Sequence, residues 1–127
     1  MNYIIMIAVV VALALADWIT GFIKGFVLGT ISSEVMRVGG AKKLLEIVVM
    51  LVGIGLDVAV RQLVTYYPHS EALAGIVGMV CALSVFLYIT LMELISILEN
   101  YAACFPEAQW AIRLTKKLKN IDSANND

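Results

Sequence analysis

The residues best placed to do chemistry in this sequence are carboxylates set inside apolar stretches. Asp17, Asp57 and Glu93 have apolar neighbours on both sides, and Glu46 lies near the start of another apolar run. A carboxylate at the middle of a membrane helix costs about 2.5–3.5 kcal/mol to insert, so it is kept only with a partner or in contact with water. These four residues are therefore candidates for inter-helix pairing or for the lining of an aqueous lumen.

Other reactive constellations are missing from the sequence. The single histidine, His69, stands beside Pro68 in a polar connection, and Cys81 and Cys104 are expected to be free thiols. We find no nucleophile with a matched base, no Cys/His cluster with metal-ligand spacing and no glycine-rich phosphate loop. We therefore expect neither an enzyme nor a cofactor or metal site.

The composition indicates the environment in which the helices that carry these carboxylates fold. The chain has 127 residues, of which 61% are hydrophobic and 15% charged, and its mean hydropathy is +0.92. Soluble domains are about 45–50% apolar and about 25% charged, and they rarely expose large apolar patches. The formal net charge of −1 argues against a nucleic-acid partner. We therefore predict an all-α integral membrane protein with the lipid bilayer as its surroundings.

Three apolar stretches are long enough to be considered as membrane spans, since a bilayer core needs about 20 residues of helix. They cover about residues 3–23, 44–60 and 72–98 of a single domain, residues 1–127. The second is the shortest, and a re-entrant or interfacial segment is its alternative. The first has a competing interpretation as a cleaved signal peptide, because Ala14-Leu15-Ala16 resembles a cleavage site.

The segments outside the spans have helical signals of their own. In the linker, residues 24–43, Ser32 or Ser33 is a candidate N-cap and Gly39-Gly40 a candidate stop for a short interfacial helix. In the cytoplasmic tail, residues 101–127, Pro106 can open a helix. One face of that helix carries Trp110, Leu114, Leu118 and Ile121, and the basic residues Arg113, Lys116, Lys117 and Lys119 lie largely away from it. This pattern predicts either a helix on the membrane surface or a solvated basic tail.

Basic residues are distributed unequally between the two sides that three spans would create. The linker and tail hold Lys24, Arg37, Lys42, Lys43, Arg113, Lys116, Lys117 and Lys119, whereas the opposite side holds Arg61. Lysine and arginine near span ends favour the cytoplasmic side. We therefore predict the N-terminus outside and the C-terminus in the cytoplasm.

Polar and small residues follow one face of each predicted span. The polar set, interpreted as inter-helix pairs or as a pore lining, is Asp17, Thr20, Lys24, Glu46, Asp57, Glu93, Ser96, Glu99 and Asn100. Asp57 and Arg61 are spaced for an i,i+4 ion pair. A second set, Gly21, Gly25, Gly29, Gly75 and Gly78, would let helix backbones approach closely, within one chain or between copies of a homo-oligomer.

Several of these residues form motifs that resemble a known family. Residues 93–100 read E-L-I-S-I-L-E-N, which is similar to a stretch at the end of the last span in the toxin-secretion and phage-lysis holins. Asp17-Trp18-Ile19-Thr20-Gly21 resembles the D-x-x-T-G of their first span. The pairs Ser32-Ser33 and Lys42-Lys43, with Asp57, Pro106 and the lysine-rich end, also match in order. Met92 stands where the family usually has asparagine, and the segment between Asn100 and Pro106 is shorter than usual.

The resemblance implies a non-enzymatic protein that accumulates in the bacterial cytoplasmic membrane, oligomerises and opens a non-specific hole. A cell-wall hydrolase (an endolysin) or a toxin would pass through it, and an antiholin is a possible partner. Two other functions stay open at the level of sequence. One is a subunit of a small ion channel or transporter; the other is an antiholin-type regulator, for which Met6 offers an internal start.

Overall fold

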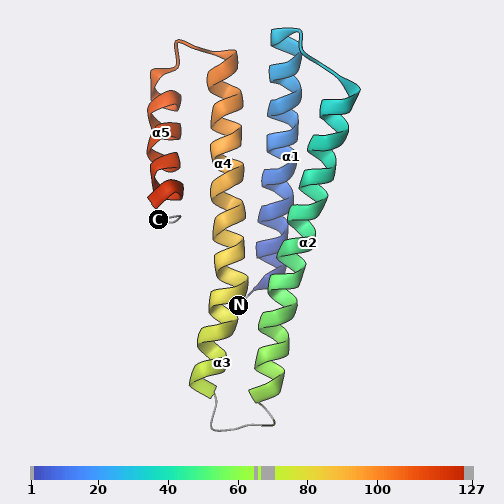
Figure 1. Cartoon of the computed structure of the whole chain (residues 1–127), viewed down its shortest axis with the longest axis vertical. Coiled ribbons are helices and arrows are strands. Elements are labelled where there is room, and N and C mark those ends of the chain that lie inside the picture. The colour runs from blue at the N-terminus through green and yellow to red at the C-terminus, as the bar shows by residue number, and fades with distance from the viewer. Residues whose placement is uncertain (1, 65, 67–70, 125–127) are drawn as a thin grey trace.

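The computed structural model describes residues 2–64, 66 and 71–124, and every element in these ranges is helical. The elements are α1 (Tyr3–Leu28), α2 (Ser33–Val64), α3 (Glu71–Gly78), the π-helix η2 (Met79–Leu83), α4 (Ser84–Cys104) and α5 (Gln109–Ala124). Figure 1 shows α1 and α4 side by side and pointing the same way, with α2 running antiparallel to both. α3, η2 and α4 form one rod, and α5 folds back along α4. The predicted all-helical class is confirmed.

Two helical segments are long and apolar enough to cross a membrane: α1, with mean hydropathy 2.3, and Gly75–Cys104, with mean hydropathy 2.2. A core helix of a soluble protein would be mostly buried, but here only 17% and 12% of the two apolar windows are buried. Their apolar side chains therefore face outward, as they do on helices surrounded by lipid. The predicted span 44–60 lies within α2, which is not one of these two segments.

The linker departs from the sequence-based expectation. The predicted cap is confirmed, because Ser32 Oγ accepts a hydrogen bond from the Val35 N–H at 3.1 Å. The predicted stop at Gly39-Gly40 is wrong, since α2 continues without a break from Ser33 to Val64. Each glycine disfavours a helix interior by only about 1 kcal/mol relative to alanine, and a Cβ at either position would meet nothing within 4 Å, so the helix continues through both at a small cost. Residues 33–43 are thus the first turns of α2 and not a separate interfacial helix.

The two turns beside the linker and the tail also differ from expectation. Gly29, expected to pack between helices, ends α1 in the left-handed conformation with φ 67°, and no atom lies within 4 Å of where its Cβ would be. The conformation is one that glycine adopts without steric cost. Pro106 lies in a turn, and α5 begins three residues later, at Gln109.

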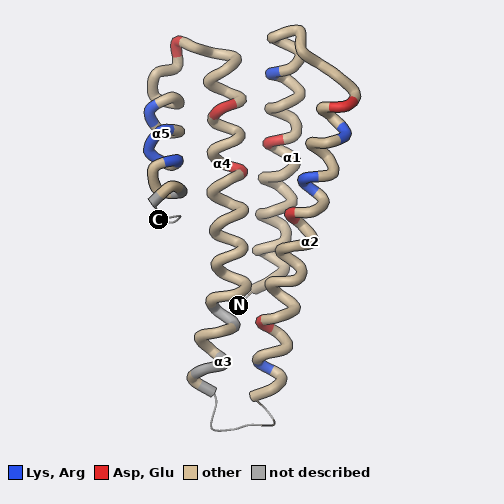
Figure 2. The backbone as a smooth tube through the Cα atoms, in the orientation of Figure 1, with Lys and Arg blue, Asp and Glu red and all other residues tan. Residues whose placement is uncertain are grey.

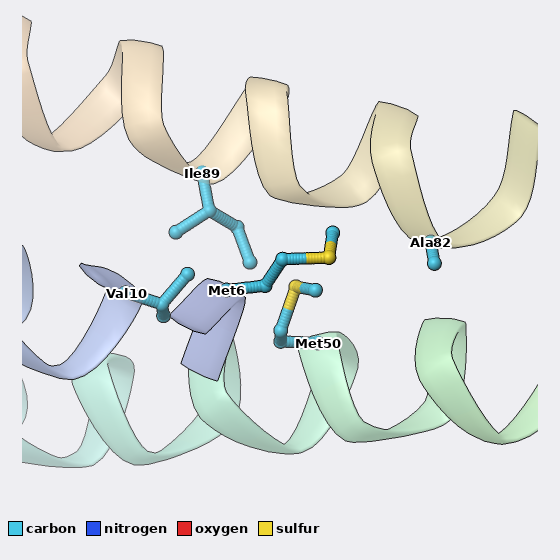
Figure 3. Close-up of a cluster of buried hydrophobic side chains, with 5 residues drawn as sticks. All are labelled: Met6, Val10, Met50, Ala82 and Ile89. Atoms are coloured by element: carbon cyan, nitrogen blue, oxygen red, sulfur yellow. The ribbon is translucent and has the colours of Figure 1, made fainter. Parts of the chain in front are cut away.

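A small core holds α1, α2 and the α3–η2–α4 rod together. Figure 3 shows its buried side chains converging from these helices: Met6, Val10, Met50, Ala82 and Ile89. Methionine fills irregular gaps between helices because its side chain is flexible and polarisable. This core fixes the rotation of the helices about their own axes, and hence which polar residues face one another.

Gly53 allows the closest approach of α2 to the π-helical segment. A Cβ at this buried position would lie 3.4 Å from the Cys81 carbonyl oxygen and from the Val85 side chain. At Gly55 and Gly75, by contrast, a Cβ would meet nothing within 4 Å. The packing glycine of this interface is therefore Gly53, which is absent from the predicted packing set. Gly78 ends α3, and its packing lies outside the described part of the structure.

We predict that Gly53→Leu destabilises the fold by about 1–3 kcal/mol relative to Gly55→Leu, because the larger side chain overpacks the contact between α2 and η2. Both variants gain the same helix propensity, so the difference between them isolates the contact. Unfolding by denaturing detergent in mixed micelles, followed by circular dichroism, measures it. Equal unfolding midpoints for the two variants would contradict the assignment.

Candidate functional site

One lysine gathers three of the four predicted carboxylates. Lys43 Nζ lies 2.8 Å from Asp17 Oδ2, 2.5 Å from Glu93 Oε1 and 3.5 Å from Glu46 Oε2. The contacts join α1, α2 and α4, and the side chain of Glu93 is only 1% exposed. Sequence reasoning placed these carboxylates at one depth, near Lys24, Lys42 and Lys43, and the structure directs all three to Lys43.

The residues around Lys43 also bring two sequence motifs together. Asn100 Nδ2 donates to Asp17 Oδ1 at 3.1 Å and to Thr20 Oγ1 at 3.3 Å, and the Thr20 hydroxyl donates to the Asp17 carbonyl at 3.0 Å. Gly21 leaves room for this contact, because a Cβ there would lie 3.6 Å from Asn100 Nδ2. We call Asp17, Thr20, Lys43, Glu46, Glu93 and Asn100 the Lys43 layer. Residues 17–21 and 93–100 therefore belong to one site.

A second polar cluster lies toward the other end of the bundle. Asp57 is fully buried, and its carboxylate accepts hydrogen bonds from Tyr3 Oη at 2.6 Å and from Arg61 Nε at 2.9 Å. The predicted ion pair between Asp57 and Arg61 is confirmed. Tyr3 was missed, because a tyrosine at the edge of an apolar stretch is also typical of a membrane interface. This cluster ties the first turn of α1 to α2.

A polar cavity of about 460 Å³ adjoins the Lys43 layer. Four residues of the layer line it, Asp17, Lys43, Glu46 and Glu93, together with Lys42, Ser96, Glu99 and Lys119. Glu99 forms an ion pair with Lys119 of α5. The cavity therefore runs from exposed charged side chains to the buried carboxylates.

α5 docks on α4 through a face that sequence reasoning did not choose. Ala111 and Thr115 are buried, and the Thr115 hydroxyl donates back to the Ala111 carbonyl at 2.9 Å. The predicted apolar face is instead largely exposed, with Trp110 57% and Ile121 54% accessible. Small residues pack against α4 because they let the two helix backbones come close. Of the larger apolar side chains, Trp110 stays more than half exposed although its ring lies 5.5 Å from that of Tyr101 of α4.

The charged residues are gathered at one end of the bundle. Figure 2 shows most of them in the half that holds the α1–α2 and α4–α5 turns, whereas Asp57 and Arg61 are the charged side chains described in the other half. Lys24 makes no ion pair with any residue that the structure describes. His69 lies outside the described residues.

The arrangement places one ammonium group among three carboxylates from three helices. Within the described ranges, no group of three or more His, Cys, Asp or Glu side chains could hold a metal ion. Each carboxylate of the Lys43 layer instead approaches an ammonium group, and Asp17 also accepts from an amide. Chemically, the site is suited to holding helices together in a medium of low dielectric constant.

We predict that Lys43→Met lowers the free energy of unfolding by about 3–5 kcal/mol, because it leaves buried carboxylates without a counter-charge. Lys42→Met is the matched control: Lys42 is the preceding residue, is exposed, and makes no ion pair within the described structure. The measurement is the unfolding midpoint in mixed micelles. Similar losses for both variants would contradict the role assigned to Lys43.

The chain was compared with known proteins and with models of protein families. Neither the curated proteins nor the solved structures compared with the chain give a match. The family model described as "Bacteriophage holin family" matches residues 2–122, a range that includes the Lys43 layer, the Asp57 cluster and all but the last two residues of α5. The chain belongs to the bacteriophage holin family.

Proposed function

We propose that this protein is a holin that accumulates in the bacterial cytoplasmic membrane, oligomerises and forms a non-specific pore. The pore would release a cell-wall hydrolase or a toxin from the cytoplasm. Family membership supports the proposal, and one structural observation carries it further. The Lys43 layer is closed within a single chain, while the outer surfaces of the same helices are apolar.

The outward surface explains how single chains could accumulate without acting. Many large apolar side chains of α1 and α2 are about half exposed or more, among them Phe22, Phe26, Val52 and Leu56. In lipid such side chains carry no penalty, because the hydrocarbon tails are as apolar as they are. A closed polar layer and a lipid-compatible surface together favour a dispersed, inactive form.

We propose that α2 is the third span, although its charges make it the least apolar of the three. From Lys43 to Arg61 the helix rises about 27 Å at 1.5 Å per residue, close to the hydrocarbon thickness of about 30 Å. Between them lie Glu46 and Asp57, and both make ion pairs inside the bundle. Since α1 supplies the core residues Met6 and Val10 before the Ala14-Leu15-Ala16 sequence and the buried Asp17 after it, we also propose that α1 is retained rather than cleaved.

Pore formation would require the polar faces to turn from the inside of one chain to a lumen shared by many. The faces that would line it are Asp17, Thr20 and Lys24 of α1, Glu46 and Asp57 of α2, and Glu93, Ser96, Glu99 and Asn100 of α4. Opening must separate α2 from α1 and α4, and so it must break the contacts of Lys43. Assembly of many copies could offset this loss by re-forming the ion pairs between chains, which would make opening depend on concentration.

We propose that the exposed side of α5 meets the inner leaflet. Three of its basic residues, Arg113, Lys116 and Lys117, are exposed, and the exposed Trp110 and Leu114 accompany them. Each basic residue near an anionic leaflet contributes about 1 kcal/mol of attraction. Lys119 is engaged with Glu99 of α4, which would hold α5 against the bundle.

For the topology, we expect the two chain ends on opposite sides of the membrane. A fluorescent protein that folds only in the cytoplasm should fluoresce at the C-terminus, and an alkaline phosphatase that folds only outside should be active at the N-terminus. The positive charges at the α5 end are the physical reason. Two crossings would instead place both reporters on the same side.

For the pore, we expect purified protein in vesicles to release an entrapped small dye and an entrapped folded protein together. Release should begin above a threshold ratio of protein to lipid, since the single chain is closed. A selective channel would pass ions and retain both cargoes, which would refute a holin pore. Stable insertion with no leakage of any cargo would instead favour an antiholin-type regulator.

A further inference from the structure

Two carboxylate oxygens of the Lys43 layer are buried, and no residue that the structure describes donates a hydrogen bond to them. They are Glu46 Oε2 and Glu93 Oε2. Lys43 Nζ donates to the other oxygen of Glu93, and its 3.5 Å approach to Glu46 Oε2 is an ion pair without a hydrogen bond. A buried acceptor that lacks a donor costs about 1–3 kcal/mol, and more when it is charged. The two oxygens therefore need a donor that the side chains do not supply.

The charge balance around these oxygens also indicates that a positive charge or a proton is missing. Asp17 faces the pair from α1 and also contacts Lys43, so one ammonium group serves three carboxylates. The other charged side chains that line the cavity are Lys42 of α2, which is exposed, and Glu99 of α4 with Lys119 of α5, which pair with each other. With all three carboxylates ionised, the layer would hold two uncompensated negative charges between apolar helices.

We infer that Glu46 and Glu93 form a proton-binding site, in which one proton is shared between the two carboxyl groups. Both side chains contact the same ammonium nitrogen of Lys43, Glu93 at 2.5 Å and Glu46 at 3.5 Å, and each has a buried oxygen without a donor. Two carboxylates that share a site cannot easily both ionise, so one of them keeps a proton. The O–H formed on one glutamate donates to an oxygen of the other, which removes one negative charge and gives both unpartnered oxygens a hydrogen bond.

The polar cavity supplies the route for this proton. It is lined by both glutamates and reaches the exposed side chains of Lys42, Glu99 and Lys119. Water entering at that end can deliver the proton or accept it, and no other bond forms or breaks. The proton would join α2 to α4, because Glu46 and Glu93 belong to these two helices. Its release at high pH would weaken their contact.

The test is infrared spectroscopy of the full-length protein in vesicles at neutral pH. A protonated carboxyl group has a carbonyl stretch well separated from that of a carboxylate, and it shifts in heavy water. We expect this band in the wild-type protein, and we expect its loss in both Glu46→Gln and Glu93→Gln. Asp17→Asn and Glu99→Gln should keep the band, because neither residue belongs to the proposed pair.

The absence of a protonated carboxyl band in the wild-type protein at neutral pH would overturn the inference. So would a band that survives in both glutamine variants, since the proton would then lie elsewhere. If a variant does not fold, a pH titration of the wild-type band decides, and loss of the band with the release of one proton per chain is expected. The readout does not involve leakage, so the inference can fail while the holin proposal stands, and the reverse also holds.

Discussion

The structure depends on giving buried carboxylates a counter-charge between helices that are otherwise apolar. Lys43 is the centre of that balance, because its ammonium group contacts carboxylates from α1, α2 and α4 at once. In a low-dielectric bundle an unpaired charge costs several kcal/mol, so the positions of the three helices are set relative to one nitrogen atom. The hydrophobic core packs the same helices together and holds their polar faces toward this nitrogen.

The parallel direction of α1 and α4 decides which residues meet in the Lys43 layer. Because both helices run the same way, Asp17 and Thr20 lie at the height of Asn100, 83 and 80 residues later in the chain. At the other end, Tyr3 and Arg61 close over Asp57. The two clusters bracket a stretch of α2 whose outward side chains are apolar. A single chain is thus polar inside and apolar outside, which suits a bilayer and conceals the groups that a pore would need.

A closed single chain is compatible with membership of the holin family if activity requires many copies. A chain whose charges are satisfied internally gains nothing from opening alone, but neighbouring chains can offer the same partners to one another. The contacts of the layer would then set the number of copies needed for opening, and the proton inferred between Glu46 and Glu93 would be one of these contacts. Gly53 contributes in a different way, because it lets α2 approach the π-helical segment closely and so sets the helix spacing at which the layer closes.

The sequence alone determined the helical class, the places of the carboxylates, the basic end of the chain and the pairing of Asp57 with Arg61, and it narrowed the linker cap to Ser32 or Ser33. All of these follow from composition or from spacings of a few residues, where helix geometry is fixed in advance. Only the tertiary structure decided that Lys43 is the shared cation, that Asn100 meets Asp17, that Tyr3 reaches Asp57, and that α2 continues through Gly39-Gly40. These features depend on helix direction and on rotation about the helix axis, which periodic hydropathy does not encode. Helix continuity in particular could not be predicted from Gly39-Gly40, because two glycines disfavour a helix by only about 1 kcal/mol each and need not end it.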